Sequence, residues 1–283
     1  MGLNSPNPGS NTSADSYPSG VRGLNNPEFP NSVALVRIVP DGDGPAFFEE
    51  AEIPLQNTHA HGAESEVYPA QEISFVWTPP DFALDFHTAS RRRIIVVLDG
   101  QMEIEDGKGE CRLFGAGDMI DILDTTGKGH KTRVVGGREM HTALIEIGDK
   151  IRPDWPLLEA AQHRTFAFTR AIAGSDGGSQ FVDETLTYNY DAPLGEATAP
   201  MALEGYQFVF KPGSLDHGFH NAPQRQFVLN LTSGMQVETS NGMTRNIHPG
   251  DIFLGDDTTG TGHKTRAINA SSRLSIFAHL LDR

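Results

Sequence analysis

The amino-acid sequence predicts an all-β protein in which one domain of barrel or sandwich type occurs twice. Three observations support this prediction. A long segment recurs at a fixed distance along the 283-residue chain, short apolar and β-branched runs alternate with turn residues, and only one short segment reads as a helix. The length agrees, since a chain of this size fits two domains of ordinary dimensions.

The repeat is clearest in two segments that end in the same five residues. Residues 117–133 read GDMIDILDTTGKGHKTR and residues 250–266 read GDIFLGDDTTGTGHKTR, so eleven of seventeen positions match. The same offset of 133 residues aligns His87 with His220. A period this long has the size of a domain and not of a solenoid repeat. We therefore expect a duplicated domain with two candidate sites.

Short strands follow one another in corresponding order in both halves. Residues 93–98 (RIIVVL) and 226–231 (QFVLNL) are apolar or β-branched runs that end at Gly-containing turns. Residues 102–105 (MEIE) and 235–238 (MQVE) alternate apolar and polar positions with the period of a half-buried strand. Short strands separated by Gly and Asn turns are typical of β-sandwiches and barrels.

Composition and the repeat together set the expected boundaries. Residues 1–32 are rich in Ser, Asn, Pro and Gly, which predicts a disordered leader. We expect an N-terminal domain at residues 33–149, a connector at 150–164 and a C-terminal domain at 165–283. Residues 155–163 (WPLLEAAQH) predict a short helix within the connector.

The charge balance excludes some partners. The chain has 22 basic and 37 acidic residues, a formal net charge of −15, which would repel nucleic acid and anionic membrane surfaces. It has one cysteine, so no internal disulfide can form. No signal segment and no apolar run long enough to span a membrane is evident, which favours a cytoplasmic protein.

Two motifs resemble those of the cupin superfamily. A strand ending in Val-Leu-x-Gly at residues 97–100 is followed by a hairpin, and Pro-Gly-Asp at 249–251 precedes a later histidine. The duplication makes the chain similar to a bicupin, and the segment Gly-Asp…Asp-Thr-Thr-Gly-x-Gly-His resembles a subgroup of small cupins. The resemblance covers both halves and implies two tandem jelly-roll barrels, each with a pocket in its mouth.

In many metal-binding cupins one motif supplies His-x-His and a Glu, and the other supplies a further His. The resemblance implies that the first and last histidines are retained in both halves, as His87, His130, His220 and His263. The other two positions hold Ala89 and Arg93 in the first half, and Ala222 and Gln226 in the second.

These departures predict an anion site in the first half. A guanidinium stays protonated and offers no lone pair, so Arg93 would repel a metal ion. His87, Arg91 and Arg93 share strand parity and could face the interior. Together with His130 they would suit a carboxylate, enolate or phosphate group. The alternative is that one or more of these arginines points outward or pairs with a structural acid.

The second half is more compatible with a metal. His220, Gln226 and His263 could bind a divalent ion such as Fe, Mn, Ni, Cu or Zn through two imidazoles and an amide oxygen. His217 would join them only if the strand bends at Gly218. Because the set is incomplete by cupin standards, no metal is expected to be obligatory.

Further residues could complete the two sites. His130 and His263 each follow an aspartate by six residues, and that carboxylate could either orient the imidazole or cap the intervening loop. Thr132 and Thr265 share parity with these histidines and could contact substrate, and Asn230 is a further candidate. His59 and His61 have metal-like spacing but lie in a loop without a histidine counterpart, so we expect them at the surface.

Three functions are compatible with these residues. The first is acid/base isomerisation, cyclisation or elimination of a small, possibly anionic, organic substrate, in which His220 and His263 or their counterparts move a proton and Arg93 or Gln226 holds an oxyanion. The second is a metal-dependent reaction such as a dioxygenation. The third is non-catalytic ligand binding or storage. A homodimer is compatible with each.

Overall fold

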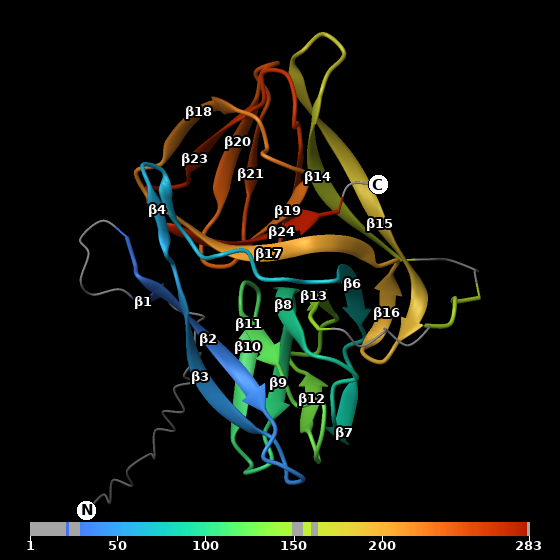
Figure 1. The fold of residues 1–283 in the computed structure, drawn as a ribbon. Coiled ribbons are helices and arrows are strands. Elements are labelled where there is room, and N and C mark those ends of the chain that lie inside the picture. The colour runs from blue at the N-terminus through green and yellow to red at the C-terminus, as the bar shows by residue number, and fades with distance from the viewer. Residues whose placement is uncertain (1–20, 23–28, 149–154, 160–163, 282–283) are drawn as a thin grey trace, which may run out of the picture.

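The structure is a computed structural model, and it describes residues 21–22, 29–148, 155–159 and 164–281. The described residues form β-strands and no helix, so the protein is all-β as the sequence predicts (Figure 1). Among these residues, therefore, none belongs to a long apolar helix of the kind that crosses a membrane.

The first half consists of two antiparallel or mixed sheets that face each other. The larger sheet has the order β3 (Phe47–Pro54), β2 (Ser32–Val39), β11 (Met119–Ile122), β8 (Arg93–Asp99), β13 (Met140–Glu146) and β6 (Glu72–Thr78). The smaller sheet has the order β10 (Cys111–Gly115), β9 (Gln101–Glu105), β12 (His130–Val134) and β7 (Ala83–His87).

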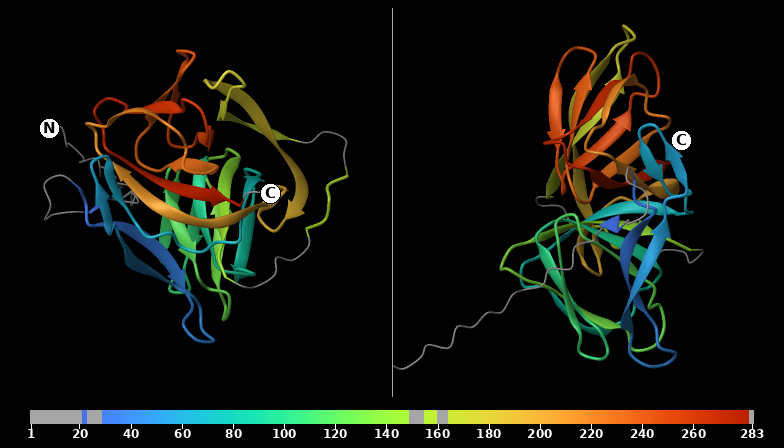
Figure 2. Two further views of the ribbon diagram at one scale, coloured as in Figure 1. Left: turned by 45° about the horizontal axis from the view of Figure 1, so that its top comes forward. Right: turned by 90° about the vertical axis from the view of Figure 1, so that its left-hand side faces the viewer.

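The second half repeats this order strand by strand. Its larger sheet runs β15 (Ser179–Ala192), β14 (Thr165–Ala173), β22 (Ile252–Asp256), β19 (Gln226–Asn230), β24 (Arg273–Leu280) and β17 (Met201–Lys211). Its smaller sheet runs β21 (Thr244–Ile247), β20 (Met235–Thr239), β23 (His263–Ala267) and β18 (Asp216–His220). The internal duplication is therefore a duplication of topology, and the two halves form two jelly-roll barrels (Figure 2).

Each half contributes a segment that pairs with an edge strand of the other half. The hairpin of β4 (Asn57–His59) and β5 (Gly62–Glu64) pairs with β17, and β16 (Gly195–Thr198) pairs with β6. The two exchanges are reciprocal. The pairing of β16 with β6, together with a direct pairing of β6 with β17, joins the larger sheets into one 16-stranded sheet. In Figure 1 the β4–β5 hairpin lies beside β18 and β23 of the second half. Strand pairing thus crosses the domain boundaries expected from the sequence.

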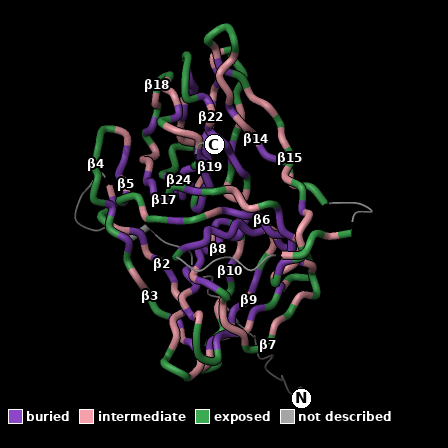
Figure 3. Tube along the Cα trace, turned by 45° about the vertical axis from the view of Figure 1, so that its right-hand side comes forward, coloured by how far each residue is buried: buried purple, intermediate pink, exposed green. Residues whose placement is uncertain are grey.

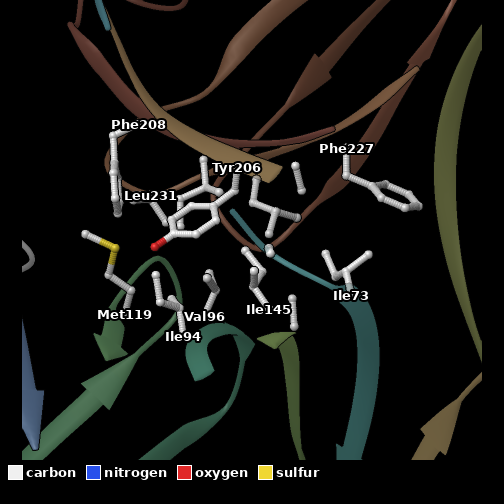
Figure 4. Packing of buried hydrophobic residues seen from close by; sticks show 14 of the residues in the cluster. Ile73, Ile94, Val96, Met119, Ile145, Tyr206, Phe208, Phe227 and Leu231 are labelled. Atoms are coloured by element: carbon white, nitrogen blue, oxygen red, sulfur yellow. The ribbon is translucent and has the colours of Figure 1, made fainter. Parts of the chain in front are cut away.

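The two halves meet across an apolar core. On β8, Ile94 and Val96 face the other half, whereas Ile95 and Val97 face the interior of their own barrel. Figure 4 shows Ile94 and Val96 below Tyr206 of β17, and Figure 3 shows the buried chain concentrated between the halves. Because both faces of β8 are buried, its sequence reads as a continuous apolar run instead of an alternating one.

The predicted connector helix is wrong for the residues that the structure describes. Leu157 forms an isolated β-bridge with Tyr190, and the N–H of Leu158 donates to the carbonyl of Asn189 at 3.0 Å. Residues 160–163 lie outside the described part of the chain. An isolated helix this short is marginal, and the segment instead satisfies its backbone by pairing with the edge of β15.

The predicted leader falls mostly on residues outside the described part of the chain. Within the predicted leader, β1 (Val21–Arg22) pairs with the start of β2. Phe29 packs edge-on against Phe210 with ring centroids 6.1 Å apart. Described residues before position 33 therefore belong to the fold.

Two equivalent glycines lie where the backbone of one half closely approaches the backbone of the other. Gly117 has φ +88° and lies against the carbonyl oxygen of Leu231, and Gly250 has φ +93° and lies against that of Leu98. A side chain at either position would overlap the other half's backbone, and it would also adopt a left-handed conformation.

We expect Gly117→Ala and Gly250→Ala each to lower the free energy of unfolding by about 2–4 kcal/mol, since steric overlap adds to the conformational penalty. Urea denaturation would measure this loss. Gly109→Ala and Gly242→Ala are matched controls, because both have positive φ but nothing within 4 Å. An equal loss in the controls would show that the contact between the halves contributes nothing.

Candidate functional site

The larger cavity lies in the barrel of the second half, with a volume of about 390 Å³. Strands β17, β18, β19, β23 and β24 contribute to its lining, together with the β4–β5 hairpin from the first half. Four of the residues predicted from the sequence line it, namely His220, Gln226, His263 and Thr265. Asn230 does not line it and instead donates to the carbonyl of Ile247 at 2.9 Å.

His263 is oriented by a buried carboxylate. Its Nδ1 donates to Oδ2 of Asp257 at 2.7 Å, and both side chains are buried. The bond fixes the tautomer and leaves Nε2 as the nitrogen with a free lone pair. Of the two alternatives that the sequence left open, the carboxylate folds back onto the imidazole. Gly262, directly before His263, lets the chain lie close to the backbone of His220, because a side chain at position 262 would overlap that backbone.

His220 lies next to His263 in the same orientation. Its Nδ1 donates to the carbonyl of Gly218 at 2.8 Å, and the two imidazole centroids are 4.6 Å apart. Burial lowers the pKa of His220, although the bond to Gly218 opposes the shift. Two imidazoles, each bonded through Nδ1, therefore lie side by side in the cavity.

The first half repeats this arrangement around a smaller cavity of about 130 Å³. His130 donates from Nδ1 to Oδ2 of Asp124 at 2.6 Å, His87 donates to the carbonyl of Asp85 at 2.9 Å, and their ring centroids are 4.6 Å apart. The residues predicted here that line the cavity are His87, Arg93, His130 and Thr132.

The arginines of the first half are held by acids. Arg91 forms ion pairs with Glu72 and, at 2.9 Å, with Glu146, and it does not line the cavity. Arg93 lines the cavity but lies 3.5 Å from Glu146 and donates to the hydroxyl of Ser90 at 2.9 Å. Burial lowers the pKa of Arg93 and raises that of Glu146, while their mutual attraction opposes both shifts. Pairing with a structural acid, the alternative left open by the sequence, is what the structure shows.

Arg273 was not identified from the sequence. It begins β24, is buried, and lines the cavity of the second half. Among the described residues no group forms a hydrogen bond or ion pair with its guanidinium, whose Nε is buried without a partner. Burial lowers its pKa to about 10. The signal was present in the repeat, because the position 133 residues earlier holds the apolar Met140.

A second cation lies opposite Arg273 on the adjacent strand. Lys211 of β17 is the cross-strand partner of Arg273 and lies 3.1 Å from Glu64, which belongs to β5 of the first half. Its counterpart in the first half is Thr78. The second cavity therefore carries two cations where the first carries none at the same positions.

His59, which is exposed as expected, and His61, which is half-buried, both line this cavity on the exchanged hairpin. His61 stacks on His217 with ring centroids 4.0 Å apart, and His217 stacks on His220 at 3.8 Å. His217 joins the cavity because β18 has a register shift between His217 and His220, which corresponds to the bend expected at Gly218.

The donors for a metal are limited. Three neutral ligands could come from Nε2 of His220, Nε2 of His263 and Oε1 of Gln226, which is buried without a hydrogen-bond partner in the described chain. In the described ranges, no three or more His, Cys, Asp or Glu side chains form a group that could hold a metal ion. The positive charge of Arg273 in the same cavity opposes binding of a cation.

No family model and no curated protein matches this sequence. The structure is similar to a cupin 2 conserved barrel domain protein from Leptotrichia buccalis (TM-score 0.37, 11% identity, 77% of this chain and 87% of that one). It is also similar to a putative glyoxylate-induced protein from Pseudomonas aeruginosa (0.36, 11%, 92% and 84%). A third similar structure is salicylate 1,2-dioxygenase from Pseudoaminobacter salicylatoxidans (0.35, 12%, 75% and 69%). At these scores none of them assigns a chemistry to this chain.

The stacked imidazoles predict a pH dependence of stability. The pKa of His217 falls to about 4, first because of burial and then because of His220, His61, Lys211 and His263. An unfolded histidine has a pKa of about 6.5. Between these values the unfolded chain binds a proton that the folded chain does not, so stability should fall as the pH drops through this window.

We expect His217→Gln to make this loss shallower, as measured by urea denaturation at a series of pH values. His248→Gln, at an exposed position outside the cavity, is the matched control. If both substitutions change the slope equally, the stack is not responsible for the pH dependence.

Proposed function

We propose that the second barrel binds a small organic anion and converts it by proton transfer, without an obligatory metal. The observation that carries this proposal is the buried guanidinium of Arg273, which has no partner among the described residues and lies in the same cavity as the Asp257-oriented His263. A buried charge without a partner is strongly disfavoured unless a ligand supplies the opposite charge.

The charges that line the cavity favour a monoanion. Lys211 is paired with Glu64, whereas Arg273 has no counterpart among the described residues, so one positive charge is left over. A carboxylate matches the planar donors of a guanidinium through two parallel hydrogen bonds. Apolar residues such as Val228 and Phe253 also line the cavity and would contact the remainder of the substrate.

The proton would move through His263. Its Nε2 can accept a proton from an acidic C–H or O–H of the substrate, and the carboxylate of Asp257 then stabilises the imidazolium. Arg273 or the amide of Gln226 would hold the negative charge that develops on a substrate oxygen. Return of the proton to a different atom completes an isomerisation, which needs no further reactant.

A metal-dependent reaction is the second candidate. It is favoured by the Nε2 atoms of His220 and His263 and by Oε1 of Gln226, which is buried and has no partner within the part of the chain that the structure describes. Metal analysis of protein purified without chelators distinguishes the candidates. Stoichiometric metal that is lost in His263→Ala would replace the first proposal by the second.

We expect Arg273→Met, which installs the residue of the equivalent first-half position, to weaken binding of small monocarboxylates at least about tenfold. Isothermal titration calorimetry would measure the affinity. The same change should stabilise the free protein, because the lowered pKa of Arg273 corresponds to about 3 kcal/mol of lost charge stabilisation.

Arg266→Met is the control, since Arg266 pairs with Asp216 at 2.9 Å and does not line the cavity. Unchanged carboxylate binding in Arg273→Met would rule out the anion site.

We expect His263→Gln to slow exchange of an acidic C–H for deuterium about 100-fold or more, since general-base catalysis contributes at least that factor. Proton NMR in D2O with 2-oxo and 3-oxo monocarboxylates as probes would measure the exchange. Binding of the same acids should change little. Carboxylate binding without exchange in the unmodified protein would instead identify a non-catalytic binder.

A further inference from the structure

The cavity of the first half differs from its counterpart in polarity. Its lining is mostly apolar and includes Phe82, Ile95, Met102, Ile122, Met140 and Leu194. Its volume of about 130 Å³ is close to the about 150 Å³ of an apolar protein cavity that binds benzene. A five-membered or six-membered ring is therefore the size of molecule that it can accommodate.

Two hydroxyl groups in this lining have no partner. Thr78 and Thr142 are 0% and 1% exposed, and the Oγ1 of each is buried without a hydrogen bond in the part of the chain that the structure describes. Both line the cavity. They lie diagonally opposite on β6 and β13, since Thr78 pairs with Met140, two residues before Thr142 on the same face. Buried hydroxyls are usually hydrogen-bonded, so a ligand oxygen would complete this pair.

The ligand should be neutral. Arg93 is the only Lys, Arg, Asp or Glu side chain among the residues that line this cavity in the described chain, and Glu146 compensates its charge. The two cations of the second cavity are replaced here by Thr78 and Met140. The segment from the other half also differs, because it presents Pro193 and Leu194 where the second cavity receives His59 and His61.

We propose that the first barrel holds a second, separate binding site, which takes a neutral cyclic alcohol or ketone. The hydroxyls of Thr78 and Thr142 bond its oxygen, and the apolar lining contacts its ring. The duplicated fold then carries two sites of different specificity, an anion site in the second barrel and this site in the first. Neither site requires the other.

Methionine methyl groups report on the two cavities separately. Met102 and Met140 line the first cavity, and Met235 lines the second. In protein labelled with 13C at the methionine methyls, titration with cyclopentanol should shift the signals of Met102 and Met140 in a saturable manner and leave Met235 unchanged. Shifts at Met235 alone, or no saturation up to the solubility limit, would overturn the proposal.

The threonines are tested by replacement with valine, which has the same shape without the hydroxyl. Thr78→Val and Thr142→Val should each weaken cyclopentanol binding about fivefold, the equivalent of one neutral hydrogen bond. The double variant should bind cyclopentanol no more tightly than cyclopentane. Thr244→Val, at an exposed position of β21, is the matched control.

Folding of these variants is checked by thermal unfolding. Removal of a buried hydroxyl that has no partner is not expected to destabilise the barrel. If one variant fails to fold, the other and the comparison of cyclopentanol with cyclopentane in the unmodified protein still decide the matter. Equal affinity for the two probes in the unmodified protein would refute a role for the hydroxyls.

Discussion

The structure depends on the reciprocal exchange of edge segments between its halves. An unpaired sheet edge exposes hydrogen-bonding groups and promotes association, and here the edges at β6 and β17 are each covered by a segment from the other half. The exchange brings the outer faces of the two larger sheets together, which buries the apolar side chains between them (Figure 4). Each barrel is consequently complete only in the presence of the other.

The exchange of edge segments also affects the two cavities. The segment that covers a sheet edge also contributes to the mouth of the neighbouring cavity, so one half supplies residues to the other's site. His61 of the first half stacks on His217 of the second, whereas Leu194 of the second half lines the cavity of the first. A substitution in a covering segment can therefore change the cavity of the neighbouring barrel and leave the cavity of its own half unchanged.

The two cavities share a histidine pair but differ in charge. Equivalent imidazoles, each bonded through Nδ1, occur at the same separation in both halves. What differs is the surrounding sheet, where Thr78 and Met140 of the first half correspond to Lys211 and Arg273 of the second. A buried guanidinium that no described residue pairs with opposes stability, which is the reason that Arg273 supports a functional interpretation.

The sequence by itself determined the all-β class and the duplication, because strand periodicity and a constant repeat offset can be read along the chain without knowledge of tertiary contacts. The resemblance to cupins implied that His87 and His130, and likewise His220 and His263, share a site, and their rings lie 4.6 Å apart in each half. The sequence did not reveal the exchanged segments, the β-bridge of Leu157 with the edge of β15, or the position of His61. Those features depend on which sheet edge lies near which loop. The acids that hold Arg91 and the isolation of Arg273 were likewise decided by tertiary structure, since strands distant in sequence supply or withhold the partner of a buried charge.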